Sequence, residues 1–200
     1  MSEFFTYLKL SAFTGLLAGC TLTFNFLLGI MISTAYVKQD YWKRLPSIFK
    51  KFDVLELHNC TAYLALILVF LHPILLLFDP KTKFSLIDIF FPINAPHEKL
   101  LVALGTLSMY AIIVVIITTQ KVIKRKLGFR TWKKIHLISY ATALLFVIHG
   151  ISIDPKLKDR PVDFIDAEKL VPEGCLLVLI AASVLRYRYY LQNKKKIERF

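Results

Sequence analysis

Long apolar runs alternate with short charged connections along the whole chain. Five runs approach or exceed the roughly 20 apolar residues that a helix needs to cross a bilayer core of about 30 Å. These runs cover residues 10–37, 57–78, 100–120, 135–153 and 174–191. No internal repeat, low-complexity tract or separate polar domain interrupts them. The pattern predicts an all-α, polytopic membrane helix bundle that forms one domain over residues 1–200.

The fifth run is the shortest, because its uncharged part ends at Arg186. Beyond that point Tyr187, Tyr189 and Tyr190 interleave with Arg186 and Arg188. This order is typical of a membrane surface, where aromatic rings and arginines reach the headgroups. We therefore expect the fifth run to cross the membrane. The first run is too long for a cleaved signal peptide and is expected to remain as a helix.

The composition agrees with a membrane protein. Hydrophobic residues make up 56% of the chain, charged residues make up 20%, and the mean hydropathy is +0.56. These values are too apolar for an ordinary soluble domain of this length. The formal net charge of +12 is explained by membrane topology and contact with anionic lipid. Nucleic-acid binding is not expected, because it would need an exposed basic domain that the sequence lacks.

Basic residues are concentrated in every second connection. The connections 38–56 and 121–134, together with the tail from Arg186, hold 18 of the 26 lysines and arginines. Because basic residues in short connections favour the cytoplasmic side, these three segments should lie inside. The N-terminus is then outside and the C-terminus is cytoplasmic, in what we expect to be a bacterial inner membrane.

The three cysteines are Cys20, Cys60 and Cys175, and each lies in a different apolar run. No C-x-x-C motif is present, so we expect buried structural thiols.

Four of the five histidines lie at or within two of the apolar runs. His58 and His72 belong to the second run, His136 and His149 belong to the fourth, and both runs should cross in the same direction. Each run then places one imidazole near the inner edge and another about 20 Å further out, at about 1.5 Å per residue. The four histidines should therefore form two pairs, each at one depth.

The helical angle supports this pairing only in part. At about 100° per residue, His58 and His72 are about 40° apart on one helix face, whereas His136 and His149 are about 140° apart. Either the two sites are rotated relative to each other, or the fourth helix is locally distorted. The geometry permits two sites without dictating them.

Two facing imidazoles at one depth suit the axial positions of a haem iron, and the apolar porphyrin face suits a bundle interior. The sequence has no C-x-x-C-H motif, so the haem would be held without a covalent link, as haem b. Cations for the haem propionates are available at the inner level as Arg130, Lys133, Lys134, Arg186 and Arg188, and at the outer level as Lys156, Lys158 and Arg160. Two other interpretations stay open: histidines that only pack through hydrogen bonds, and metal transport.

The segments LHNCTAYLALILVFLHP and RKLGFRTWKKIHLISYATALLFVIHGI together resemble the ferric reductase-like transmembrane domain. Ferric reductases, NADPH oxidases and the haem-binding membrane subunit of the periplasmic methionine sulfoxide reductase system share this domain. The resemblance covers about residues 55–190 and rests on H-x13-H in one helix and H-x12-H in another. It implies an inner haem ligated by His58 and His136 and an outer haem ligated by His72 and His149.

We therefore expect a b-type membrane cytochrome that carries single electrons from a cytoplasmic donor to an acceptor at the outer face. It would be the electron-transfer component of an oxidoreductase, with no catalytic residue of its own. The chain has no G-x-G-x-x-G motif, so a flavin would come only from a partner such as a cytoplasmic flavin reductase. One alternative is a quinol-linked haem subunit that feeds a periplasmic oxidoreductase. An alternative of another class is a non-redox metal transporter or membrane scaffold.

Labelling can test the predicted topology. In a cysteine-free background, a cysteine placed at Lys124 should be protected from a membrane-impermeant reagent added outside, and one placed at Asp163 should react. The reason is that Lys124 lies in a basic connection and Asp163 lies in an acidic one. The opposite labelling pattern would exchange the donor and acceptor sides and leave the histidine pairs as they are.

Overall fold

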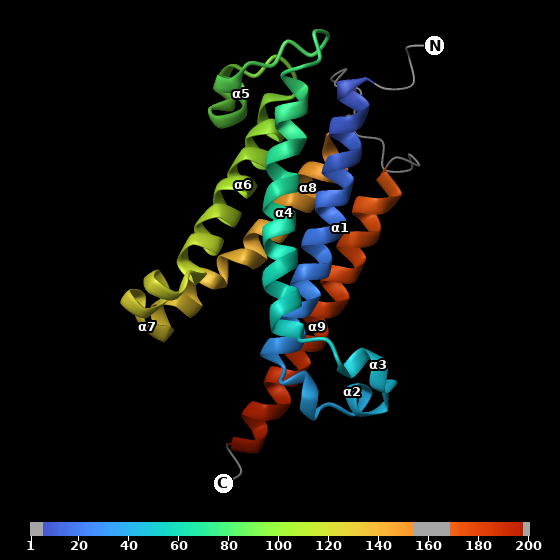
Figure 1. Cartoon of the computed structure of the whole chain (residues 1–200), viewed down its shortest axis with the longest axis vertical. Helices are drawn as coiled ribbons and strands as arrows, with labels where there is room; N and C mark the ends of the chain where they lie inside the picture. The colour runs from blue at the N-terminus through green and yellow to red at the C-terminus, as the bar shows by residue number, and fades with distance from the viewer. Residues whose placement is uncertain (1–5, 154–168, 198–200) are drawn as a thin grey trace.

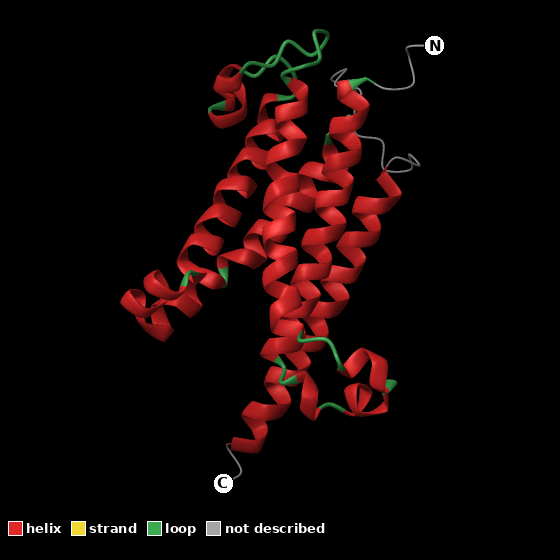
Figure 2. Cartoon of the chain, in the orientation of Figure 1, coloured by secondary structure: helices red, strands yellow, loops and turns green. Residues whose placement is uncertain are grey.

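The computed structural model describes the backbone of residues 6–153 and 169–197, with side chains for 6–153 and 169–193. Within these ranges every regular element is a helix (Figure 2). Five helical segments are long and apolar enough to cross a membrane. The prediction of an all-α membrane bundle is confirmed.

The long helices are α1 (Tyr7–Ser33), α4 (Val54–Leu76), α6 (Lys99–Thr119), α7 (Lys121–His136), α8 (Ile138–Ser152) and α9 (Leu170–Ile197). The short ones are η1 (Tyr36–Lys38), α2 (Asp40–Arg44), α3 (Ser47–Lys50), α5 (Leu86–Phe90) and η2 (Pro92–Asn94). Helices α7 and α8 follow each other directly and together make up the fourth candidate span.

Helix α1 lies at the centre of the bundle and packs against α4, α8 and α9. In Figure 1, α4, α1 and α9 run side by side, and α8 crosses obliquely behind α4. Helix α6 packs against α8 and α4. The basic segments α2, α3 and α7 lie at the same end as the C-terminal part of α9, and α5 lies at the opposite end (Figure 1). The side of the membrane that each end faces stays a prediction.

Small residues allow the helices to approach closely. Ala18 of α1 and Ala65 of α4 have no exposed surface, and Ser108 of α6 is equally buried. The hydroxyl of Ser108 donates a hydrogen bond to the carbonyl of Thr142 in α8, at 3.2 Å. Helices inside lipid associate through such close packing and hydrogen bonding, because moving apolar side chains from lipid to protein gains little.

Two predicted helix boundaries differ from the structure. The first run was expected to extend over residues 10–37, but α1 ends at Ser33 because Ala35 adopts a left-handed conformation with φ of 50°. The fourth run is predicted over residues 135–153, with a local distortion as one of two ways to pair its histidines, and the structure divides it. His136 ends α7 and α8 begins at Ile138, so Leu137 separates two helices.

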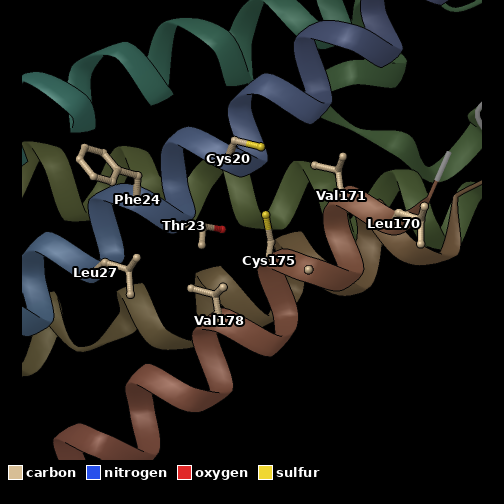
Figure 3. Close-up of a pocket in the computed structure, with 9 residues that line it drawn as sticks. Cys20, Thr23, Phe24, Leu27, Leu170, Val171, Cys175 and Val178 are labelled. Atoms are coloured by element: carbon tan, nitrogen blue, oxygen red, sulfur yellow. The ribbon is translucent and has the colours of Figure 1, made fainter. Parts of the chain in front are cut away.

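The prediction of buried thiols is wrong for Cys20 and Cys60, which are exposed, whereas Cys175 is half-buried. Cys20 on α1 and Cys175 on α9 lie on the sides of their helices that face each other, beside a pocket that Thr23, Phe24 and Val178 also line (Figure 3). A thiol behaves as a small apolar group, so the exposed surface of Cys20 and Cys60 carries little cost in a membrane bundle.

One buried carboxyl group joins the beginning of α1 to the end of α4. Asp79 is 6% exposed. Its Oδ2 accepts from the backbone N–H of Leu8 at 3.0 Å, and its Oδ1 accepts from the N–H of Lys81 at 3.0 Å. Both carboxyl oxygens are therefore engaged with backbone donors.

We expect Asp79→Asn to lower the free energy of unfolding by about 1–3 kcal/mol, because the amide turns an NH2 group toward one of these donors. Denaturant unfolding of the detergent-solubilised protein measures this change. The matched control is Asp40→Asn, which removes an exposed ion pair to Lys43 of 3.0 Å and should cost only about 0–1 kcal/mol. Equal losses in the two variants would contradict the structural role of Asp79.

Candidate functional site

The structure brings the four predicted histidines together in two pairs. Helix α4 carries His58 and His72, α7 ends with His136, and α8 carries His149. The ring centroids of His58 and His136 lie 6.3 Å apart with an interplanar angle of 67°. Those of His72 and His149 also lie 6.3 Å apart, with an angle of 76°. Two sites with equal ring separation are thus stacked along the bundle.

The break at Leu137 explains how the fourth span supplies both pairs. On one ideal helix His136 and His149 would point about 140° apart. His136 closes α7 and His149 lies within α8, and between them the N–H of Tyr140 donates to the carbonyl of Leu137, three residues back rather than four, so the chain is wound more tightly at this point. The local distortion is therefore at the residue directly after His136.

The histidines of the outer pair are held through their Nδ1 atoms. Nδ1 of His72 lies 2.7 Å from the carbonyl oxygen of Ser11, and Nδ1 of His149 lies 2.8 Å from the carbonyl oxygen of Leu101. A carbonyl only accepts, so Nδ1 carries the proton in each ring. The Nε2 atom of each ring then keeps its lone pair, which is the form that binds a metal.

The two histidines of the inner pair have different surroundings. Nδ1 of His58 lies 3.1 Å from the carbonyl oxygen of Asn25, the same arrangement as in the outer pair. Among the described residues, Nδ1 of His136 is buried without a hydrogen-bond partner. The His136 ring instead stacks on Trp132, with centroids 5.2 Å apart and an interplanar angle of 28°.

The pairs offer two ligands each and no more. In the part of the chain that the structure describes, no group of three histidine, cysteine, aspartate or glutamate side chains could hold a metal ion. A zinc site ordinarily takes three or four protein ligands, whereas a haem iron takes only its two axial ligands from the protein. Each pair therefore fits a metal whose remaining ligands come from a prosthetic group such as a porphyrin.

The ring separation fits the same group. With a metal–nitrogen bond of about 2 Å and about 1 Å from that nitrogen to the ring centre, two imidazoles across one metal have centres about 6 Å apart. Both pairs show 6.3 Å.

The family described as "Ferric reductase like transmembrane component" matches residues 14–147, which is about two thirds of the chain. The chain belongs to this family. The matched region includes His58, His72 and His136 and ends just before His149. The comparisons with curated proteins and with solved structures give no match. Together with the five apolar helices, the family identifies an integral membrane protein with a redox-related role.

Two cations lie close to the inner histidine pair of this ferric reductase-like chain. Lys124 and Arg186 are near enough to His136 to act on it electrostatically. Nζ of Lys124 lies 3.7 Å from the centre of the Trp132 ring, and the guanidinium of Arg186 lies 4.9 Å from the centre of the Tyr140 ring. Of the predicted propionate partners, the half-buried Arg186 is therefore placed beside the site.

The other predicted cations are placed differently. Arg130, Lys133, Lys134 and Arg188 have exposed side chains, and Lys156, Lys158 and Arg160 lie outside the described residues. The sequence did not indicate Lys124 as a neighbour of the histidine pair. Helix α7 bends at Gly128, which has φ of 74° and ψ of 158°, and this bend allows Lys124 to lie over Trp132. A glycine within a basic connection was the only signal, because few other residues adopt a positive φ readily.

Proposed function

We propose that this chain is a b-type membrane cytochrome that binds two haems and carries single electrons across the membrane. The observation that carries the proposal is the presence of two histidine pairs, each with a ring separation of 6.3 Å, at two depths of one bundle. Membership of the ferric reductase-like family supports a redox role.

In this proposal His58 and His136 are the axial ligands of the inner haem, and His72 and His149 are those of the outer haem. When bound, the haem iron supplies a one-electron couple between its ferric and ferrous states. The protein's own contribution is to orient the rings. The carbonyl groups of Ser11, Asn25 and Leu101 hold Nδ1 of three histidines and leave Nε2 available.

The bundle interior would exclude water from the porphyrin faces. The apolar cluster of Ala18, Leu68, Val69, Met109 and Ile112 is buried among α1, α4 and α6. Arg186 and Lys124 would face the propionates of the inner haem, because both lie close to His136. A low-dielectric interior with cations only at its edge favours a haem whose charged groups point outward.

The proposed direction of transfer is from a cytoplasmic donor to an acceptor on the outer face. The donor would be a flavin reductase or a quinol, and the acceptor would be an external substrate or a periplasmic oxidoreductase. The membrane potential assists this direction, since an electron leaving a negative interior gains about 2.3 kcal/mol per 100 mV. In a bacterial cell the protein would lie in the inner membrane, with the basic end of the bundle in the cytoplasm.

Ligation can be tested by single substitutions. Purified protein should contain two low-spin haems b. His72→Ala or His149→Ala should lose the outer haem, and His58→Ala or His136→Ala should lose the inner one, because each variant removes one of two axial ligands. Haem content and the absorption spectrum of the reduced protein measure the result.

The control for these variants is His97→Ala, which changes a histidine outside both pairs and should keep both haems. Full haem content in all four ligand variants would overturn the ligand assignment. A colourless wild-type protein would overturn the cytochrome proposal and favour a transporter or scaffold.

The source of electrons can be tested with the same protein. Given NADPH alone, the haems should stay oxidised, because the 200 residues contain no G-x-G-x-x-G nucleotide-binding motif. Addition of a flavin reductase or of a quinol should reduce them, and stopped-flow absorption distinguishes the two donors by their rates. Rapid reduction by NADPH without a partner would contradict the need for a separate donor.

The basic helix α7 is a candidate docking surface for an acidic flavoprotein, since opposite charge speeds encounter. Charge-neutral substitution at Lys124, Arg125 and Lys126 tests this role. Because Lys124 also contacts Trp132, a second variant changes only the exposed Arg125 and Lys126. For this second variant docking predicts slower haem reduction and a weaker salt dependence at unchanged haem content. Reduction at the wild-type rate would leave topology as the only role of these charges.

A further inference from the structure

Three of the four histidines rest on the same local arrangement of a neighbouring helix. Each Nδ1 lies within hydrogen-bonding distance of a backbone carbonyl, and the residue four positions after that carbonyl is a glycine. The three combinations are Ser11 with Gly15 against His72, Asn25 with Gly29 against His58, and Leu101 with Gly105 against His149. The arrangement occurs twice on α1 and once on α6.

The histidine rings occupy the space where a side chain of the glycine would begin. A Cβ atom at Gly15 would lie 2.9 Å from Nδ1 of His72, and one at Gly105 would lie 2.9 Å from Cε1 of His149. Real Cβ atoms essentially never approach a heavy atom this closely. At Gly29 the contact with Cε1 of His58 would be 3.3 Å, which is tight but less severe.

A property of the α-helix explains the spacing of four. The carbonyl of residue i accepts from the N–H of residue i+4, so the Cβ of residue i+4 flanks the carbonyl oxygen. A glycine at i+4 opens that side and lets a second donor reach the same oxygen. Glycine is unfavourable in a helix interior relative to alanine. The three glycines therefore lower the stability of their helices but leave room for an imidazole ring beside the carbonyl.

The arrangement occurs twice on α1 because the contacting residues of α1 and of α4 have the same spacing. Residues 11 and 25, residues 15 and 29, and residues 58 and 72 are each fourteen positions apart. Residue 11 meets His72 and residue 25 meets His58, so α1 and α4 run in opposite directions with matching periods.

His136 is the exception among the four. None of the seven glycines of the chain has a Cβ position near His136, and its Nδ1 has no hydrogen-bond partner among the described residues. The histidine without the glycine is also the one without the carbonyl bond, which supports the link between the two.

We propose that Gly15, Gly29 and Gly105 are positioning residues that hold the rings of His72, His58 and His149 with Nδ1 on a backbone carbonyl. The effect on haem ligation rests on the proposed function, whereas the contact between glycine and ring does not. A methyl group at these positions displaces the ring from its place on the carbonyl. The ligand geometry is then disturbed although every ligand is still present.

The experiment compares three Gly→Ala variants with two matched controls. Gly15→Ala and Gly105→Ala should lose most of the outer haem or its low-spin spectrum, and Gly29→Ala should show a smaller loss at the inner haem. Gly174→Ala has open space around the new methyl, and Gly150→Ala makes an ordinary contact of 3.5 Å with Pro172. Both controls should match the wild type. Loss of haem in the controls to the same extent would overturn the proposal.

A double-mutant cycle on haem-free protein tests the contact itself. Gly105→Ala should lower the unfolding temperature when His149 is present and raise it in the His149→Ala background, where alanine only improves the helix. The same cycle applies to Gly15 and His72. An equal change of the unfolding temperature in both backgrounds would show that the glycine position does not contact the histidine ring, and would overturn the inference.

The two measurements separate this inference from the proposed function. If the wild-type protein contains no haem but the cycle shows strong coupling, the proposed cytochrome function is refuted and the contact between each glycine and its histidine ring still holds. If the wild-type protein contains two haems and the glycine variants have the same haem content as the controls, the cytochrome function holds and the positioning role of the glycines is refuted.

Discussion

An imidazole inside a membrane bundle must satisfy its N–H group without water, and the rest of this structure depends on that constraint. Three histidines meet it by donating to backbone carbonyls of α1 and α6. Those carbonyls already serve their own helices, so the imidazole reaches them only where a glycine leaves the backbone bare. The unprotonated nitrogen is then free for chemistry, and its direction is fixed by rigid helices.

The same constraint gives α1 its central position. It packs against α4, α8 and α9, and it supplies carbonyl groups at both depths of the bundle. Small residues keep it close to α4, since Ala18 and Ala65 have no exposed surface. Helix α1 carries none of the four histidines and meets His58 and His72 through backbone carbonyls and the polar side chains of Ser11 and Asn25. This is why the sequence alone drew attention to the histidines and passed over this helix.

The features that depend on one helix at a time could be predicted from the sequence, and those that depend on a neighbour could not. Hydropathy and charge are local, so five spans and two histidine levels followed from them. The angle of about 140° between His136 and His149 even indicated a distortion, which the structure places at Leu137. Gly15 and Lys124 gave no comparable signal, because their importance depends on which helix lies opposite and on the bend at Gly128. The exposure of Cys60 was missed for a similar reason, since hydropathy does not distinguish an exposed position on a membrane helix from a core position.

The division of the fourth span at Leu137 leaves its two histidines in different surroundings. His149 is carried by α8, which is wedged between α1, α6 and α9, whereas His136 closes a helix that extends out of the bundle (Figure 1). The two histidines of the fourth span, thirteen positions apart in the sequence, are thus surrounded unequally by the rest of the bundle.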